Sequence, residues 1–358
     1  MLPVPTQGKL DRMPRVSTPA ALFYVALHAL WGAFWSGPAA AQTPSDTLAA
    51  VKARGQLVCG VATAGVGLSI PDSQGVWRGM DADYCRAFAA AVLGDAGKVR
   101  FVATTTQQRF TALQSGEVDV LARATTWTFL RDVTQGLSFT GVNLYDGQGF
   151  MVRAVSGVKT AKELDGATVC LLPGTTGEQN VSDWFRANGL RLQPVVIEAA
   201  SEMRAAFLAG RCDVYSNDRT ELVGVRAALG PRAEELVILP ETISKEPLGP
   251  LVRKGDWRWF DIIKWTHYAL LAAEELGVTS ANVDAMRAST NPEIRRLLGL
   301  EGDFGKQLGL ENGWAAAAVK QVGNYGELWD RNQKPLGVDR GPNRLWRDGG
   351  LQYAPPLR

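Results

Sequence analysis

Arg131 and Asp218 are the residues of this sequence whose type and position indicate chemistry most directly. Arg131 lies eight residues after Arg123, and Asp218 lies five residues after Asp213, each close to the end of a predicted strand. A planar guanidinium donates two parallel hydrogen bonds to a carboxylate, and a carboxylate suits an ammonium. Such a pair could hold a small zwitterion. A lone Arg after a strand is more often a surface residue, and a lone Asp is more often a cap or a loop anchor.

An internal repeat places these two residues in comparable settings. Residues 112–120 (ALQSGEVDV) and 206–214 (AFLAGRCDV) both resemble the end of a helix, then a glycine, then a strand. The glycine ends each helix by adopting a left-handed conformation. The copies lie 94 residues apart, which predicts two α/β lobes of similar plan. One lobe then has a cation near a strand end, and the other has an anion.

Predicted strands alternate with predicted helices in both halves of the chain. This alternation is typical of βαβ units with largely parallel sheets. Ligands of such folds bind beyond the carboxyl ends of the strands. Strands are expected at 57–61, 168–172, 195–197 and 236–239, and helices at 178–187 and after the expected caps Asp81 and Ser201.

Composition excludes several classes of function. The chain has 38 basic and 36 acidic residues, a net charge of +2, which argues against a nucleic-acid binder. Its two His and four Cys form no C-x-x-C or H-x-x-x-H pair, so most zinc sites are excluded and no metal or cofactor is expected. His267, in the apolar helical stretch 257–276, is expected to be a packed or surface residue rather than a catalyst.

The N-terminus is typical of an exported protein. Lys9, Arg12 and Arg15 precede an apolar run at 20–35, and small residues end at Ala41. This order predicts a signal peptide at 1–41, cleaved after Ala41, and hence a periplasmic protein. A membrane anchor is the alternative, but the run is short for a span. Translation starting at Met13 would give a leader of ordinary length. Removal of 1–41 leaves 35 basic and 35 acidic residues.

Four motifs in order resemble the periplasmic solute-binding proteins of polar amino-acid ABC transporters, solute-binding protein family 3. Order and spacing agree over roughly residues 47–275, and the general L-amino-acid-binding subgroup is the most similar. Its marks here are DYCRA at 83–87, TTWT at 125–128 and NPEIRRLLG at 291–299. The four motifs are GMDAD at 79–83, GEVDVLARATTWTFLRD at 116–132, LPGTTGE at 172–178 and GRCDVYSND at 210–218.

The resemblance implies a role for each site residue. Arg131 would hold the ligand's carboxylate and Asp218 its ammonium. The backbone amides of Thr126 and Thr176 would donate to the carboxylate, and the carbonyl of Ala124 would accept from the ammonium. Two further residues are expected near the ligand. Trp127 would either line the pocket or pack beneath the loop. Leu68 stands where many members place an aromatic residue, which favours broad specificity.

The resemblance also implies an α/β, two-lobe periplasmic-binding-protein fold of type II with two chain crossovers at a hinge. The crossovers are expected near 147–151 and 247–252. Ligand would bridge the lobes and shift the population toward the closed form. The expected parts are a signal peptide at 1–41, lobe 1 at 46–147, lobe 2 at 148–247, a return to lobe 1 at 248–290 and a C-terminal extension at 291–358.

The four cysteines allow three pairings. Pairs Cys59–Cys85 and Cys170–Cys212 would each lie within one lobe and suit an exported protein. The other two pairings would join lobe to lobe and block closure. Four buried thiols are the remaining alternative.

The expected function is capture of a free L-amino acid and its delivery to the permease subunits of an ABC importer in the inner membrane. The protein is expected to be a monomer, with no enzymatic activity and no nucleic-acid partner. An exported dehydratase on the same fold is one alternative. It needs a general acid, for which Glu178 is the candidate. A ligand-sensing module is the other alternative.

Overall fold

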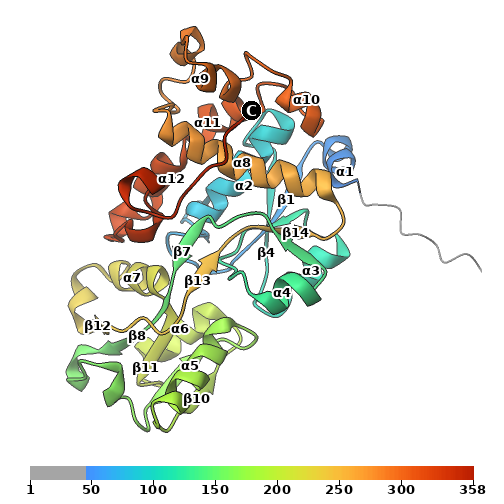
Figure 1. The fold of residues 1–358 in the computed structure, drawn as a ribbon. Helices are drawn as coiled ribbons and strands as arrows, with labels where there is room; N and C mark the ends of the chain where they lie inside the picture. Colours follow the sequence, from blue (N-terminus) through green and yellow to red (C-terminus); the bar gives the residue numbers. More distant parts are fainter. Residues whose placement is uncertain (1–45) are drawn as a thin grey trace, which may run out of the picture. The chain divides into compact units, whose positions relative to one another are not determined.

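The computed structural model describes residues 46–358. Within these residues two five-stranded sheets form separate lobes, joined by two short strands and followed by a helical C-terminal region (Figure 1). The predicted signal peptide, with its cleavage after Ala41, lies outside the described residues. No helix among residues 46–358 is both long and apolar enough to cross a membrane.

Lobe 1 is built on a sheet of order β4-β1-β5-β14-β6. Strands β4 and β5 pair with β1 in parallel, and β14 is antiparallel to β5 and β6. The strands are β1 (Leu57–Val61), β4 (Val99–Ala103), β5 (Val120–Leu121), β6 (Leu137–Phe139) and β14 (Leu251–Arg253). A small hairpin adds β2 (Ile70–Pro71) and β3 (Trp77–Arg78). The helices are α1 (Thr47–Arg54), α2 (Met80–Leu93), α3 (Arg109–Ser115), α4 (Phe129–Thr134) and α8 (Trp257–Glu275).

Lobe 2 repeats this plan with a sheet of order β10-β9-β11-β8-β12. Strands β10 and β11 pair with β9 in parallel, and β8 is antiparallel to β11 and β12. The strands are β8 (Gln148–Arg153), β9 (Thr168–Leu171), β10 (Gln193–Val196), β11 (Val214–Asp218) and β12 (Leu236–Ile238). The helices are α5 (Thr176–Ala187), α6 (Ala200–Leu208) and α7 (Arg219–Ala227), with short 3-10 turns η1 (Ala154–Ser156), η2 (Ala161–Glu163) and η3 (Gly230–Glu235). The predicted two-lobe α/β fold is confirmed.

The sequence repeat has a structural cause that is the same in both lobes. Gly116 and Gly210 both have φ 81°, the predicted left-handed conformation that follows each helix. Three residues later, the carboxylate of Asp119 accepts from the N–H of Val58 at 2.7 Å. The carboxylate of Asp213 likewise accepts from the N–H of Thr168, at 2.9 Å. Each Asp therefore ties its own strand to the first residues of the neighbouring parallel strand.

The two connections between the lobes form a small antiparallel ladder of their own. Strand β7 (Leu144–Asp146) leads out of lobe 1 and pairs with β13 (Glu246–Leu248), which leads back. The outward crossing therefore falls at Gly147, because β8 already belongs to the sheet of lobe 2. The return crossing, made by β13, lies at the beginning of the range 247–252 that the sequence predicted.

Two predicted helix caps are wrong. Helix α2 begins at Met80 with Gly79 as its N-cap. A side chain on Gly79 would place a Cβ 2.3 Å from the carbonyl oxygen of Leu68. Asp81 is instead buried in the first turn, and its carboxylate accepts from the N–H of Ala124 at 2.8 Å. Helix α6 begins after Ala199, so Ser201 lies inside its first turn.

The C-terminal region packs against lobe 1 (Figure 1). Helices α11 and α12 lie on α2 and α8, and their apolar side chains join the same core. Arg331 donates to the carboxylate of Asp83 at 2.8 Å, which gives the second Asp of the GMDAD motif a structural role. The elements are η4 (Ala285–Ala288), α9 (Pro292–Leu297), α10 (Phe304–Leu308), α11 (Trp314–Val322), α12 (Tyr325–Asn332), η5 (Lys334–Leu336), η6 (Gly341–Asn343) and η7 (Trp346–Asp348).

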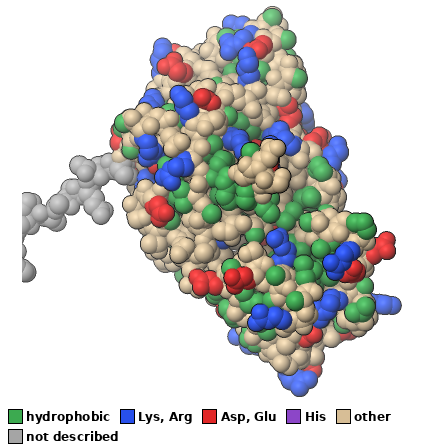
Figure 2. Space-filling view, turned by 180° about the vertical axis from the view of Figure 1, so that it is seen from behind, with side chains coloured by type: hydrophobic (Ala, Val, Ile, Leu, Met, Phe, Trp, Pro, Cys, Tyr) green, Lys and Arg blue, Asp and Glu red, His purple; other side chains and the backbone are tan. Residues whose placement is uncertain are grey.

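This region also reaches the hinge. Asn343 accepts from the N–H of Tyr145 at 2.7 Å and donates to its carbonyl at 2.9 Å. One side-chain amide thus satisfies both backbone groups of a hinge residue in β7, much as a neighbouring strand would. On the face seen in Figure 2, basic and acidic side chains are interspersed, in keeping with the small net charge of the chain.

All four cysteines are paired as predicted. Cys59 of β1 is bonded to Cys85 of α2, and Cys170 of β9 to Cys212, which lies just before β11. Each bond joins a central strand to an element of the same lobe. Neither bond restricts movement of one lobe relative to the other.

Candidate functional site

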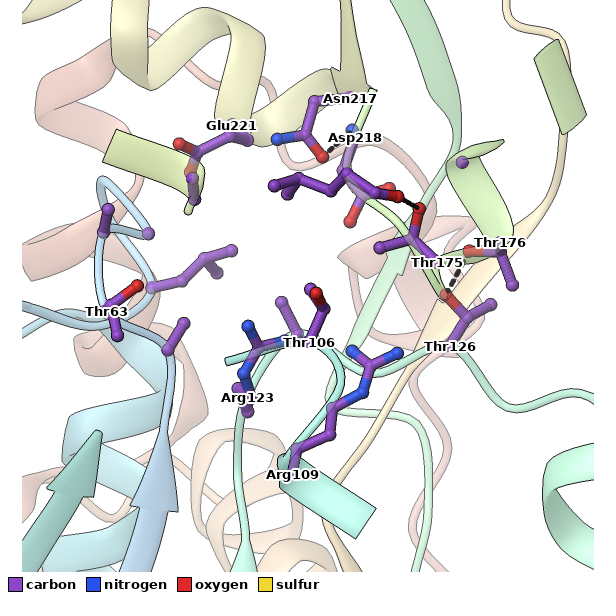
Figure 3. Close-up of a pocket in the computed structure, with 18 of the residues that line it drawn as sticks. Thr63, Thr106, Arg109, Arg123, Thr126, Thr175, Thr176, Asn217, Asp218 and Glu221 are labelled. Atoms are coloured by element: carbon purple, nitrogen blue, oxygen red, sulfur yellow. Dashed lines mark hydrogen bonds between the residues drawn. The ribbon is translucent and has the colours of Figure 1, made fainter. Parts of the chain in front are cut away.

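A cavity lined by both lobes lies at the carboxyl ends of their parallel strands (Figure 3). Segments that follow β1, β4 and β5 form its lobe 1 side. The loop after β9 and the end of β11 form most of its lobe 2 side. The predicted ligand residues that line it are Leu68, Ala124, Thr126, Arg131, Thr176 and Asp218. Trp127 does not line this cavity.

The loop after β5 is held in an unusual conformation. Ala124 has φ 42°, the one positive φ at a residue other than glycine within the described part of the chain. Its N–H donates to Asp81, and two residues later Thr126 forms a β-bridge with Leu248 of β13. Strained backbone that its surroundings hold in place is common at binding sites. The turn aims the polar groups of this loop at the cavity.

Arg131 is buried and partly anchored. It lies in the first turns of α4, where Thr128 caps the helix by accepting from the N–H of Arg131 at 3.3 Å. Its Nη1 donates to the carbonyl of Thr126 at 2.9 Å, and its guanidinium lies over the ring of Phe110. Burial lowers its pKa, while the nearby acids Glu246 and Asp218 oppose that effect. The remaining guanidinium nitrogens are left for a partner in the cavity.

Asp218 faces the same cavity from the end of β11. Burial is the main cause that raises the pKa of its carboxyl well above the ordinary value, and the acids Asp146, Glu246 and Glu221 raise it further. Arg131 acts in the opposite direction. A buried carboxyl among acids favours a cation beside it, since a cation restores the charged form.

Glu246 connects the two lobes at the hinge, although no sequence motif pointed to it. The hydroxyls of Thr126 and Thr176 donate to its Oε2 at 2.5 and 3.0 Å. Its Oε1 accepts from Asn180 of α5 at 2.7 Å and from Ser244 at 2.6 Å. The two threonine hydroxyls lie 3.2 Å apart, so the lobes touch directly here. The threonine side chains are thereby occupied, and their backbone amides remain for a ligand.

Three further charged residues line the cavity that sequence reasoning missed: Arg109, Arg123 and Glu221. Arg123 donates from Nε to the carbonyl of Thr104 at 2.9 Å, and burial lowers its pKa to about 10. Burial raises the pKa of Glu221 to about 8. Arg123 stands inside the second motif, directly after a strand, and that position could have identified it. Nothing in the pattern marked Arg109 or Glu221.

Three other candidates lie elsewhere. The carboxylate of Glu178 accepts from the N–H of Gly174, in the loop before α5, at 3.0 Å. Glu178 is not among the cavity residues. Trp127 is 39% exposed and stacks on Phe139, which agrees with the packing alternative. His267 is buried, with its Nδ1 2.8 Å from the hydroxyl of Tyr84, and burial lowers its pKa to about 3. Of the two settings predicted for His267, packed or surface, the structure shows the packed one.

Two α/β lobes of repeated plan, joined by two strands and sharing one charged cavity, define a periplasmic-binding-protein fold of type II. The model of the bacterial extracellular solute-binding proteins, family 3, matches residues 57–282. The chain belongs to this family.

Relatives extend the similarity beyond the family model. The general L-amino acid-binding periplasmic protein AapJ of Rhizobium johnstonii is 52% identical over 93% of this chain and 98% of its own. The glutamate/glutamine/aspartate/asparagine-binding protein BztA of Rhodobacter capsulatus is 54% identical over 90% of this chain and 95% of its own. A solved periplasmic binding protein from Brucella ovis with glutathione bound is 52% identical, with a TM-score of 0.85 over 88% of this chain and 100% of that one. These shares exceed the family match at 57–282 and must include at least part of the C-terminal region.

Proposed function

We propose that this protein is the extracytoplasmic substrate-binding component of an amino-acid ABC importer, which captures a free L-amino acid between its lobes and delivers it to the membrane permease. The observation that carries the proposal is the placement of Arg131 and Asp218. They line one cavity from opposite lobes, with opposite charge; Arg131 is buried and Asp218 is half-buried. An α-amino acid carries the two complementary groups on a single carbon.

The ligand's carboxylate is held by the free nitrogens of Arg131 and by the backbone amides of Thr126 and Thr176. Thr176 lies in the first turn of α5, where backbone N–H groups have no partner within the helix. The ammonium is held by Asp218 and by the carbonyl of Ala124. Leu68 contacts the ligand's side chain. All of these residues line the cavity, which supports the assignment.

The relatives support an amino-acid ligand and a transport role. AapJ is named for binding L-amino acids in general, and BztA for four acidic and amide amino acids. Both are matched over at least nine-tenths of their length. The proposal includes export by the leader at 1–41, action as a monomer and docking of the closed form on the permease.

Closure follows from a ligand that contacts both lobes. Thr126 of lobe 1 and Thr176 of lobe 2 already meet at Glu246, so the lobes are in contact beside the hinge. Opening breaks these hydrogen bonds and returns the charges of the cavity to water. A ligand that bridges the lobes binds the closed form better and increases its population.

A thermal-shift screen of the mature protein against the free L-amino acids tests this proposal. Binding raises the melting temperature by mass action, so at least one L-amino acid should raise it and its D-enantiomer should not. Calorimetry then measures the affinity of each hit. The absence of binding by any amino acid in either measurement would refute the proposal.

A dehydratase-like activity is a second candidate, and Glu221 is the observation that favours it. This carboxyl lines the cavity, and its pKa of about 8 keeps it protonated near neutral pH, as a general acid requires. Glu221 therefore replaces Glu178, which lies outside the cavity, as the candidate general acid. Incubation with a prephenate-like substrate, followed by detection of product, distinguishes an enzyme from a binding protein.

A further inference from the structure

Arg109 is a buried cation that the proposed zwitterionic ligand leaves without a partner. It is the first residue of α3, lines the cavity, and is 3% exposed. Its Nε and Nη2 are buried and have no hydrogen-bond partner. Figure 3 shows its guanidinium directed into the cavity, between Arg123 and Thr126.

The other charges around the cavity are already matched. In the proposed complex, Arg131 holds the ligand's carboxylate and Asp218 its ammonium. Arg123 donates to a backbone carbonyl and lies near Asp81, which stabilises its charge. Glu221 accepts from a backbone N–H, and its raised pKa of about 8 leaves it mostly uncharged near neutral pH, so it supplies no anion for Arg109.

The surroundings of Arg109 are unfavourable for an unpaired charge. Burial lowers its pKa most, and the neighbouring Arg123 and Arg131 lower it further, with Asp218 alone acting in the opposite direction. The ring of Phe110 lies 4.6 Å from its guanidinium carbon and offers only a weak attraction. Buried donors without acceptors cost free energy, and Arg does not deprotonate readily. The positive charge of Arg109 therefore has no anionic partner, and an anion bound beside it would neutralise it.

We infer that Arg109 binds a second carboxylate, carried on the side chain of the ligand, so that the site prefers dicarboxylic L-amino acids to neutral ones. A planar carboxylate matches the two free nitrogens of the guanidinium. This inference rests on the proposed function and narrows the broad specificity expected from Leu68. Neutral amino acids still bind through Arg131 and Asp218, but they leave Arg109 without a partner.

Calorimetry with L-glutamate and L-norvaline tests the inference, since the two ligands have five carbons each and differ in the side-chain carboxylate. The native protein should bind L-glutamate about 10- to 100-fold more tightly, the range expected for one charge-assisted hydrogen-bonded pair. In Arg109→Gln the ratio of the two affinities should fall toward one. Arg100→Gln, which changes an exposed arginine on β4, should keep the native ratio.

The outcomes separate this inference from the proposed function. If the native protein binds both ligands equally, or if Arg109→Gln keeps the preference for L-glutamate, the second-carboxylate site is refuted and amino-acid capture stands. If no amino acid binds to the native protein, both fail. Should Arg109→Gln lose its cooperative thermal unfolding, Arg109→Lys serves instead. It keeps the charge without the planar fork, and it should reduce the preference without abolishing it.

Discussion

Replacement of Asp218 by Asn should separate ligand binding from folding. The change keeps the shape of the side chain and removes the charge proposed to hold the ligand's ammonium. Because Asp218 and Arg131 line one cavity between the lobes, the ligand's ammonium would be left there without a counter-charge. Loss of one partner from such a pair costs about 3–5 kcal/mol. The dissociation constant should therefore rise about 150- to 5,000-fold.

The same replacement should stabilise the protein without ligand. The raised pKa of Asp218 means that its ionised form is disfavoured in the folded state, mainly by burial and then by three neighbouring acids. A carboxyl with a raised folded pKa contributes stability below its unfolded pKa and loses it as pH rises. Near neutral pH, removal of this carboxyl should raise the ligand-free melting temperature by about 1–3 °C, which corresponds to ~1 kcal/mol.

Calorimetric titration and thermal unfolding of Asp218→Asn measure both effects. Asp183→Asn, an exposed change on α5 of the same lobe, is the matched control and should bind as the native protein does. A near-native affinity in Asp218→Asn would refute the assignment of the ammonium. A lower melting temperature without ligand would show that Asp218 instead supports the fold.

Three further outcomes are expected. Replacing Cys170 and Cys212 together by Ser should lower the free energy of unfolding by about 4 kcal/mol, the value expected for a loop of this length, and chemical denaturation would measure it. The low pKa of His267, about 3, means that the folded state resists its protonation, so stability should fall as pH drops below about 6.5. In His267→Gln that fall should be shallower, and an unchanged pH profile would contradict the reasoning. Asn343→Ala removes two hydrogen bonds to the hinge and should lower the melting temperature by a few degrees, whereas no change would mean that the C-terminal region does not support the hinge.

Sequence patterns identified the features that depend on neighbouring residues or on recurrent motifs. The repeat predicted two lobes because Gly116 and Gly210 must each leave the helix in a left-handed conformation. The cysteine pairs followed once each Cys was placed on a strand or helix of one lobe, because only those pairings allow closure. Asp81 shows the limit of such reasoning: its type suggested a cap, but its carboxylate instead joins α2 to the loop after β5.

The amino-acid sequence by itself predicted the two-lobe α/β plan and the one disulfide pairing compatible with closure, and its family motifs predicted the opposed pair of Arg131 and Asp218. These features lie within motifs or follow from the local rules of helices and strands. Only the tertiary structure decided that Arg109 and Glu246 belong to the site, and that the C-terminal region lies on lobe 1 and the hinge. Each of these depends on contacts between segments far apart in the chain, and on which side chains folding removes from water. Burial, rather than residue type, makes Arg109 an unsatisfied cation.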